Sequence, residues 1–283
     1  MPAGGTARGV VQINHGLAEH AARYQRFARL LAGHGYHVYA HDHRGHGATR
    51  APDSIPGAFA SKDGAAKVID DVAAIHALIA EQHPGLPVVT FGHSMGGLIA
   101  LNFAEAHPQA SAALAVWNSN FNAGLAGRAG QVALRLEAFF KGSDTPSAIL
   151  PKLTFQAWAK GMPDRRTDFD WLSRDPVEVD LYVVDPLSGW DATVSMWQDV
   201  FRLIYAGGDA ANLAKRNDGR VAAGPGRHTA RNPQRDQPRQ VDGELRELAR
   251  QGSPRPSLTT SEDSPPACTC APVQRTARPF SGR

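Results

Sequence analysis

The pentapeptide Gly92-His93-Ser94-Met95-Gly96 places a serine in a setting that suits a nucleophile. It matches G-x-S-x-G, the pattern of a sharp strand-to-helix turn that exposes a serine hydroxyl at the edge of a parallel sheet. The apolar residues 86–91 predict a short buried strand before the turn, and residues 95–107 predict a helix after it. Such a turn crowds its own backbone, which favours small residues, and Gly92 and Gly96 supply them. We therefore predict that Ser94 is a catalytic nucleophile.

A serine hydroxyl needs a base to accept its proton, and in turns of this kind an acid and then a histidine follow the serine along the chain. Two histidines follow Ser94. His107 lies thirteen residues along the predicted helix, about 20 Å away at 1.5 Å per residue, and cannot reach. His228 is the remaining histidine, in a Gly- and Pro-rich stretch with no predicted strand before it. The triad acid and the triad histidine thus stay unassigned.

The elements that must position Ser94 alternate in type over the first 118 residues. Apolar runs predict strands, and runs with helical periodicity predict helices between them. The predicted strands are residues 10–14, 36–40, 86–91 and 112–117, and the predicted helices are residues 20–32, 64–83 and 95–107. This alternation predicts an α/β fold with a mostly parallel sheet covered by helices. Active sites of such sheets lie at the carboxyl ends of the strands, where His15-Gly16, residues 42–47 and Ser94 all occur.

Three motifs carry a resemblance to a known family. They are His15-Gly16-Leu17-Ala18-Glu19-His20, Asp42-His43-Arg44-Gly45-His46-Gly47 and Gly92-His93-Ser94-Met95-Gly96-Gly97, and they occur in this order. Together they resemble the monoacylglycerol lipase and lysophospholipase branch of the α/β-hydrolases, which is often grouped with serine aminopeptidases. The resemblance covers roughly residues 8–215.

The resemblance implies an ester hydrolase that forms an acyl-enzyme on Ser94, with small acyl esters such as monoacylglycerols or lysophospholipids as substrates. It implies an oxyanion hole made by the backbone N–H groups of Leu17 and Met95, with His15 and Gly16 supporting the loop that carries Leu17. No cofactor or metal is expected. Two alternatives stay open: a catalytically inactive relative that lacks the triad acid and histidine, and a peptidase or haloperoxidase on the same fold.

The chain divides into three parts. Residues 1–118 are predicted to form the hydrolase core, and residues 119–205 a helical cap over the sheet, with helical pieces near Phe139-Phe140, residues 155–158, Trp171 and residues 196–205. Residues 206–283 are predicted to be a linker and a disordered tail, because few large apolar residues occur after Lys215. We expect no strand there and a sheet that is incomplete at both edges.

The change of composition near residue 216 is abrupt. Residues 216–283 contain twelve Arg, no Lys and seven acidic residues. We hypothesise that this part is encoded out of frame. The coding DNA tests the hypothesis, because the alternative frame must encode an apolar strand, an acid and a histidine.

Composition excludes several classes of protein. The 283 residues are 42% hydrophobic with a net charge of +3, and the basic excess lies in the tail without interleaved aromatics, which argues against nucleic-acid binding. No apolar run reaches the roughly 20 residues of a membrane span, and no leader is recognisable, so we expect a cytoplasmic protein with at most weak association with lipid surfaces. Cys268 and Cys270 form no recognisable metal motif, and the histidines of residues 41–46 are expected to brace the site rather than bind metal.

Overall fold

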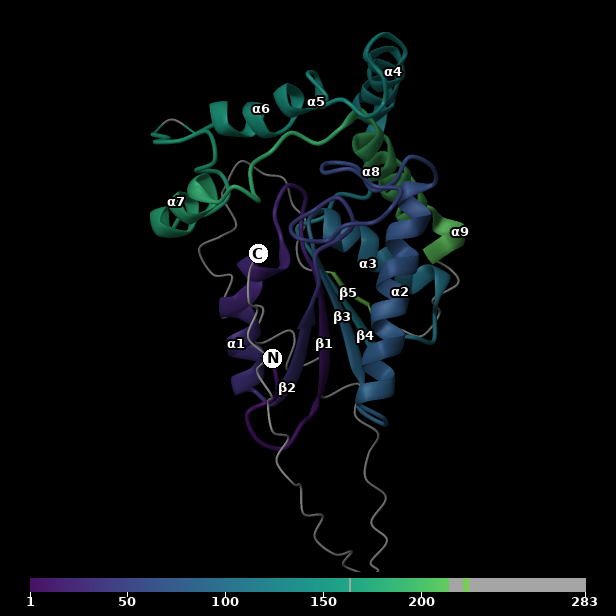
Figure 1. Cartoon of the computed structure of the whole chain (residues 1–283), viewed down its shortest axis with the longest axis vertical. Helices are drawn as coiled ribbons and strands as arrows, with labels where there is room; N and C mark the ends of the chain where they lie inside the picture. Colours follow the sequence, from purple (N-terminus) through teal and green to yellow (C-terminus); the bar gives the residue numbers. More distant parts are fainter. Residues whose placement is uncertain (163, 214–220, 224–283) are drawn as a thin grey trace, which may run out of the picture. The chain divides into compact units, whose positions relative to one another are not determined.

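The computed structural model describes residues 1–162 and 164–213, together with the backbone of residues 221–223. Strands and helices alternate along the first 117 residues, and helices follow (Figure 1). In chain order the elements are β1 (Gly9–Asn14), the 3-10 helix η1 (Ala21–Tyr24), α1 (Gln25–Gly33), β2 (Tyr36–Ala40), α2 (Gly64–Gln82), β3 (Val88–His93), α3 (Met95–Ala106), β4 (Ala113–Trp117), α4 (Gly124–Lys141), α5 (Leu150–Leu153), α6 (Phe155–Lys160), α7 (Pro176–Val184), α8 (Val194–Gly207), α9 (Ala210–Leu213) and β5 (Val221–Ala223).

The sheet is parallel, with the strand order β2-β1-β3-β4-β5. The four strands expected from the first 118 residues are confirmed. Pairing of Asn14 with Gly92, and of His93 with Trp117, aligns the carboxyl ends of the three central strands. The ends of these strands therefore place the residues that follow them, Ser94 included, along one edge of the sheet.

The expectation that no strand follows Lys215 was wrong. β5 pairs parallel with β4 over three residues, Val221 to Ala223. Strand pairing is made by backbone hydrogen bonds, and the edge of β4 offers them to a segment too short for an apolar pattern to be recognised. The prediction that the tail is disordered mostly concerns residues that the structure does not describe. His228, Cys268 and Cys270 also lie outside the described residues.

Helices cover the two faces of the sheet because successive strand residues point to opposite sides. Val11 and Ile13 of β1 share a hydrophobic cluster with Leu31 of α1. The opposite face carries Val10, which packs with Ile79 of α2. α1 lies on one side of the strands, and α2 and α3 lie on the other (Figure 1).

The helices α4 to α7 lie beyond the carboxyl ends of the strands (Figure 1). One expected helical piece was wrong, because Trp171 lies in a turn and the next helix begins at Pro176. The Trp171 ring stacks on Phe155 with 5.4 Å between ring centroids, so aromatic packing rather than a helix orders this segment. α8 falls within the range expected for the cap, but its residues, Phe201 among them, belong to the main hydrophobic core with residues of α2 and α3.

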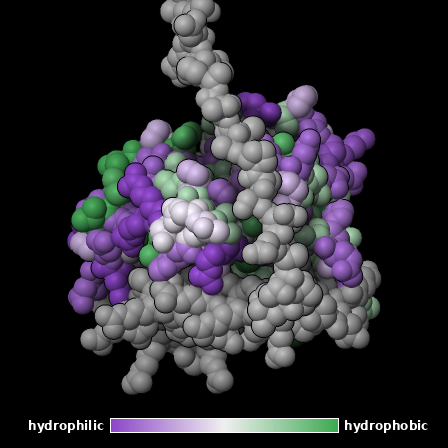
Figure 2. All heavy atoms as spheres, turned by 90° about the horizontal axis from the view of Figure 1, so that it is seen from below, coloured by the Kyte–Doolittle hydropathy of each residue, from purple (hydrophilic) through white to green (hydrophobic). Residues whose placement is uncertain are grey.

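The N-terminal residues run beside the outer edge of β2. The Val38 N–H donates to the Met1 carbonyl at 2.8 Å, and the Met1 ammonium group donates to the Val38 carbonyl at 2.5 Å. On the end of the molecule opposite to α4–α7, hydrophilic residues predominate among those described (Figure 2). None of the helices in the described part of the chain is long and apolar enough to cross a membrane.

Candidate active site

Ser94 occupies the tight turn between β3 and α3. Its backbone has φ 53° and ψ −120°, a left-handed conformation that non-glycine residues rarely adopt and that is typical of a strained strand-to-helix turn. Its N–H donates to the Trp117 carbonyl at 2.9 Å. Its carbonyl accepts from the Gly97 N–H at 3.0 Å and from the Ser119 hydroxyl at 2.7 Å. These contacts hold the Ser94 backbone in place, and its side chain is partly exposed.

The two elbow glycines are required by close backbone contacts. A Cβ on Gly92 would lie 2.2 Å from the Gly96 carbonyl oxygen, and a Cβ on Gly96 would lie 2.1 Å from the Asn14 carbonyl oxygen. Both contacts are far shorter than carbon and oxygen tolerate. The turn therefore needs small residues for two reasons. Its own backbone crowds Gly92, and the end of the neighbouring strand β1 crowds Gly96.

The two predicted oxyanion donors lie on different elements. Met95 is the first residue of α3, and the first N–H groups of a helix have no acceptor within the helix. The same helix end also favours negative charge. Leu17 lies in the loop after β1 and packs against the main hydrophobic core. Its neighbour Ala18 is buried and has a positive φ of 55°.

His15 supports this loop from inside the protein. It is fully buried, and its Nε2 accepts from the His43 N–H at 2.9 Å, while Nδ1 lies 2.8 Å from the Gly16 carbonyl oxygen. Nε2 must be unprotonated to accept, so Nδ1 carries the proton and donates to Gly16. The predicted supporting pair, His15 and Gly16, thus links the Leu17 loop to the turn after β2.

The histidines of that turn pack around His15. The rings of His43 and His46 lie 4.5 and 5.1 Å from the His15 ring, and that of His41 lies 4.9 Å from His43. Burial lowers the pKa of His43, lowers that of His41 to about 4 and that of His46 to about 3. Burial opposes the charged form, so these imidazoles are neutral at pH 7. Within the described chain, no group of three or more His, Cys, Asp or Glu residues is arranged to hold a metal ion.

Glu19 is a site residue to which sequence reasoning assigned no role. Its Oε1 accepts from the Gly16 N–H at 2.6 Å and from the Tyr24 hydroxyl at 2.7 Å, and its Oε2 accepts from Arg23 Nε at 3.3 Å. Oε1 also lies 3.7 Å from Nδ1 of His93. Burial alone would raise the pKa of the Glu19 carboxyl, but the charge of nearby His93 and the hydrogen bond from Tyr24 are among the effects that outweigh burial and lower it to about 2. An acid three residues after Gly16, within the first motif, was the available signal.

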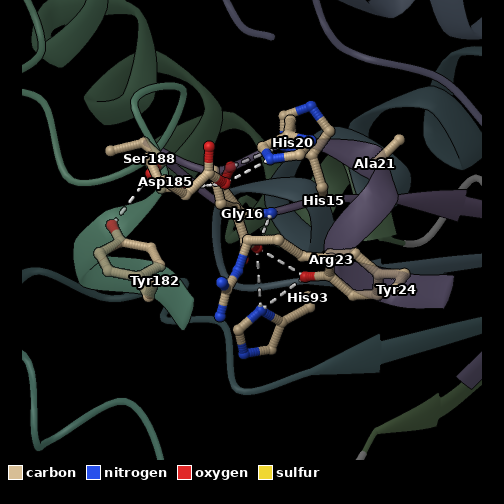
Figure 3. Close-up of polar contacts among 12 residues, drawn as sticks. His15, Gly16, His20, Ala21, Arg23, Tyr24, His93, Tyr182, Asp185 and Ser188 are labelled. Atoms are coloured by element: carbon tan, nitrogen blue, oxygen red, sulfur yellow. Dashed lines mark hydrogen bonds and ion pairs between the residues drawn. The ribbon is translucent and has the colours of Figure 1, made fainter. Parts of the chain in front are cut away.

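A second link joins this loop to the segment that ends α7. His20 Nε2 lies 2.6 Å from Asp185 Oδ2, and the Ala18 carbonyl accepts from the Tyr182 hydroxyl and the Gly189 N–H, both at 2.9 Å. Figure 3 shows His20 facing Asp185 on one side of the loop, and Tyr24 facing His93 on the other. The loop that carries Leu17 is therefore held by residues at the end of α7 and by residues at the elbow.

The triad partners of Ser94 stay unassigned. In the described chain after Ser94, His107 is the only histidine; it is the C-cap of α3 and packs on Phe103 with 5.2 Å between ring centroids. His228 lies outside the described residues. The part of the chain that the structure describes thus holds the elbow and the Leu17 loop, but no histidine that sequence reasoning can pair with Ser94.

Residues 5–214 match the family model described as "Serine aminopeptidase, S33". The chain belongs to this family. The matched S33 region contains all three motifs and all the site residues described above. The predicted assignment to the α/β-hydrolases is confirmed.

Curated relatives are similar to about two thirds of this chain. The monoacylglycerol lipase of Mycolicibacterium smegmatis is 34% identical over 180 residues, which are 64% of this chain and 56% of the relative. The monoglyceride lipase of Homo sapiens is 31% identical over 183 residues, which are 65% of this chain and 53% of the relative. The chain thus spans about half the length of the curated relatives it matches.

Solved structures share the fold. A thermostable carboxyl esterase from Bacillus coagulans superimposes with a TM-score of 0.66 at 21% identity, over 87% of this chain and 89% of the esterase. The monoacylglycerol lipase of Paleococcus ferrophilus gives a TM-score of 0.58 at 18% identity, over 89% of this chain and 97% of the lipase. At these identities the likeness shows the α/β-hydrolase fold, and the predicted fold class is confirmed.

Proposed function

We propose that this S33-family chain is a serine ester hydrolase of the monoacylglycerol lipase type. The Ser94 hydroxyl oxygen attacks the ester carbonyl, the ester C–O bond breaks, and the alcohol leaves with the proton that the serine hydroxyl loses. Water then attacks the acyl-enzyme, which releases the acid and restores the Ser94 hydroxyl. The single observation that carries the proposal is the elbow geometry of Ser94, with φ 53° at the carboxyl end of β3. This strained conformation is maintained by surrounding contacts, and such conformations cluster at functional sites.

The oxyanion of the tetrahedral intermediate would be bound by the backbone N–H groups of Met95 and Leu17. The Met95 N–H begins a helix, whose end favours negative charge. The Leu17 N–H belongs to a loop with several anchors, so little reorganisation is needed when the negative oxygen develops. Loss of one such donor costs about 2.7–4 kcal/mol of transition-state stabilisation in a serine hydrolase.

The substrate class rests on the relatives. Two of them are called monoacylglycerol lipase and monoglyceride lipase, so we propose a monoacyl ester, either a monoacylglycerol or a lysophospholipid. Such substrates reside at lipid surfaces. Large apolar side chains on α4 suit that location, since Phe139 and Phe140 are 82% and 78% exposed. We propose a weak, reversible association of α4 with lipid surfaces.

A catalytically inactive chain is the second candidate. This candidate is favoured by the positions of the two histidines that follow Ser94. His107 is too far along α3 to reach Ser94, and His228 lies outside the described residues. Without a base, the Ser94 hydroxyl is a poor nucleophile. A peptidase or haloperoxidase activity on the same fold is a third candidate. It agrees with the family description and with one structural neighbour, a protein of Mycobacterium tuberculosis named as a non-heme bromoperoxidase.

The test is Ser94-dependent turnover by the purified full chain. Hydrolysis of p-nitrophenyl butyrate and labelling by a fluorophosphonate probe, both lost in Ser94→Ala, support the proposal. Because no histidine among the described residues can be paired with Ser94, we expect marginal turnover. Labelling without turnover indicates an activated serine in an incomplete triad, and absence of both overturns the proposal. A panel of a monoacylglycerol, a lysophospholipid, an amino-acid p-nitroanilide and a halogenation assay separates the activities.

A further inference from the structure

We propose that Glu19 is a positioning residue that sets the Leu17 loop against the elbow, so that the two oxyanion N–H groups face one point. This inference rests on the proposed hydrolase function and deepens it. The two amides belong to different segments, since Met95 begins α3 whereas Leu17 lies in the loop after β1. Their relative position therefore depends on whatever joins the loop to the elbow.

Glu19 makes that junction with a single carboxylate. Its Oε1 accepts from the N–H of Gly16, the residue immediately before Leu17, at 2.6 Å. The same oxygen lies 3.7 Å from Nδ1 of His93, the residue immediately before Ser94. One carboxylate oxygen thus contacts a direct neighbour of Leu17 and a direct neighbour of the nucleophile.

Tyr24 completes a second path between the two segments. Its hydroxyl donates to Glu19 Oε1 at 2.7 Å and lies 3.0 Å from His93 Nδ1. A hydroxyl has one proton, so when Tyr24 donates to Glu19, its oxygen accepts from the Nδ1–H of His93. Figure 3 shows the Tyr24 and His93 side chains pointing toward each other. The loop, the 3-10 helix η1 and the elbow therefore meet at one carboxylate.

The chemistry requires a carboxylate at this point. Three donors converge on it: the Gly16 N–H, the Tyr24 hydroxyl and Arg23 Nε. A carboxylate only accepts, whereas an amide of the same shape brings two donors of its own. Glu19→Gln would retain the bulk and force a donor against the remaining donors. The pKa of about 2 for Glu19 keeps the group ionised throughout the physiological range.

The close contact between Gly16 and Glu19 leaves the loop little freedom to change its position. A Cβ on Gly16 would lie 2.6 Å from Glu19 Oε1, so the loop backbone already approaches the carboxylate as closely as it can. An error of about 1 Å in the position of a catalytic group can cost about 100-fold in rate. Loss of the Glu19 contacts would therefore affect the transition state more than the bound substrate.

The experiment compares Glu19→Gln with Tyr24→Phe in the full chain, and Glu81→Gln on the exposed surface of α2 is the matched control. Hydrogen exchange of the peptide spanning residues 15–18 reports the loop without any need for activity. We expect exchange there to be about tenfold faster in Glu19→Gln, with the α2 peptide and Glu81→Gln unchanged.

Reactivity provides the second readout. We expect fluorophosphonate labelling of Ser94 and kcat on p-nitrophenyl butyrate to fall about 10- to 100-fold in Glu19→Gln, with KM within about twofold and a smaller loss in Tyr24→Phe. Unchanged exchange at residues 15–18, or faster exchange throughout the protein, overturns the proposal. If Glu19→Gln fails to fold, Tyr24→Phe decides by the same criteria. A wild-type chain that is neither labelled nor active overturns the hydrolase function, while exchange still decides the role of Glu19.

Discussion

His20 Nε2 lies 2.6 Å from Asp185 Oδ2, a contact between residues 165 positions apart in the chain. It joins the loop after β1 to the segment that ends α7. Asp185 also accepts from the Ser188 hydroxyl at 2.9 Å and from the Leu187 N–H at 2.9 Å. These two hydrogen bonds within its own segment hold the carboxylate that contacts His20. Burial opposes ionisation of Asp185, but these hydrogen bonds and His20 lower its pKa. The end of α7 and the candidate oxyanion loop are therefore connected through a largely buried polar contact.

A double-mutant cycle measures this connection. His20→Gln, Asp185→Asn and the double variant should show a coupling energy of about 1 kcal/mol in urea unfolding, because the two side chains are only 14% and 20% exposed. The exposed pair Arg166–Asp180, at 3.0 Å, is the matched control, and solvent should make its coupling smaller. Equal coupling in the two pairs would show that the His20–Asp185 contact adds nothing specific.

Gly96→Ala should be among the most destabilising single substitutions in the elbow. The added Cβ would lie 2.1 Å from the Asn14 carbonyl oxygen, which belongs to a central strand and cannot move aside. We expect a loss of more than about 3 kcal/mol in the free energy of unfolding, or no folded protein. Gly33→Ala in α1 is the control, because nothing lies within 4 Å of its Cβ position. It should gain up to about 1 kcal/mol in thermal unfolding. A folded Gly96→Ala with the stability of the wild type would contradict the elbow geometry.

The histidines after β2 should make the protein acid-sensitive. Burial lowers the pKa of His41 to about 4 and of His46 to about 3, whereas histidines of the unfolded chain titrate near pH 6.5. Below that pH the unfolded state binds protons that the folded state does not. Stability is therefore fully present above about pH 7 and falls as the pH drops through 6.5 toward 4, by up to about 1.4 kcal/mol per pH unit for each histidine.

Urea midpoints at pH 7.5 and pH 5.5 test this expectation, since carboxylates stay largely ionised over that range. The midpoint should be lower at pH 5.5. His41→Gln should reduce the difference between the two pH values, because it removes one of the groups that take up a proton on unfolding. Identical midpoints at the two pH values would mean that these imidazoles titrate in the folded protein as they do in the unfolded chain.

Substitution of Phe139 and Phe140 by Ser should weaken binding to vesicles and leave the fold unchanged. Both side chains are mostly exposed on α4, so their replacement leaves no cavity in the core. Flotation with phosphatidylcholine vesicles containing monoacylglycerol measures the binding, and Leu78→Ser, which changes a 43% exposed side chain on α2, is the control. Equal flotation of the wild type and the double variant would show that Phe139 and Phe140 do not contribute to lipid binding.

Much of the core could be predicted because its signals are local. Alternating apolar runs of the right lengths identified four strands and the helices between them, and β2 has the bounds that were expected. β5 was missed because three residues are too few for a periodic pattern, although the edge of β4 can still pair with them. Trp171 was assigned to a helical piece because aromatic composition suits a packed helix, whereas it stacks on Phe155 from a turn.

The sequence by itself determined the turn at Ser94. A strand, two glycines around the serine and a following helix impose short-range steric limits, and such limits act in any context that forms the turn. The tertiary structure alone decided the surroundings of that turn. Only it brings Glu19 to His93 and His20 to Asp185, and only it places the Asn14 carbonyl where Gly96 must lack a side chain. Ion pairs, hydrogen bonds and close contacts between distant segments depend on how the elements pack, and no local pattern along the chain specifies that arrangement.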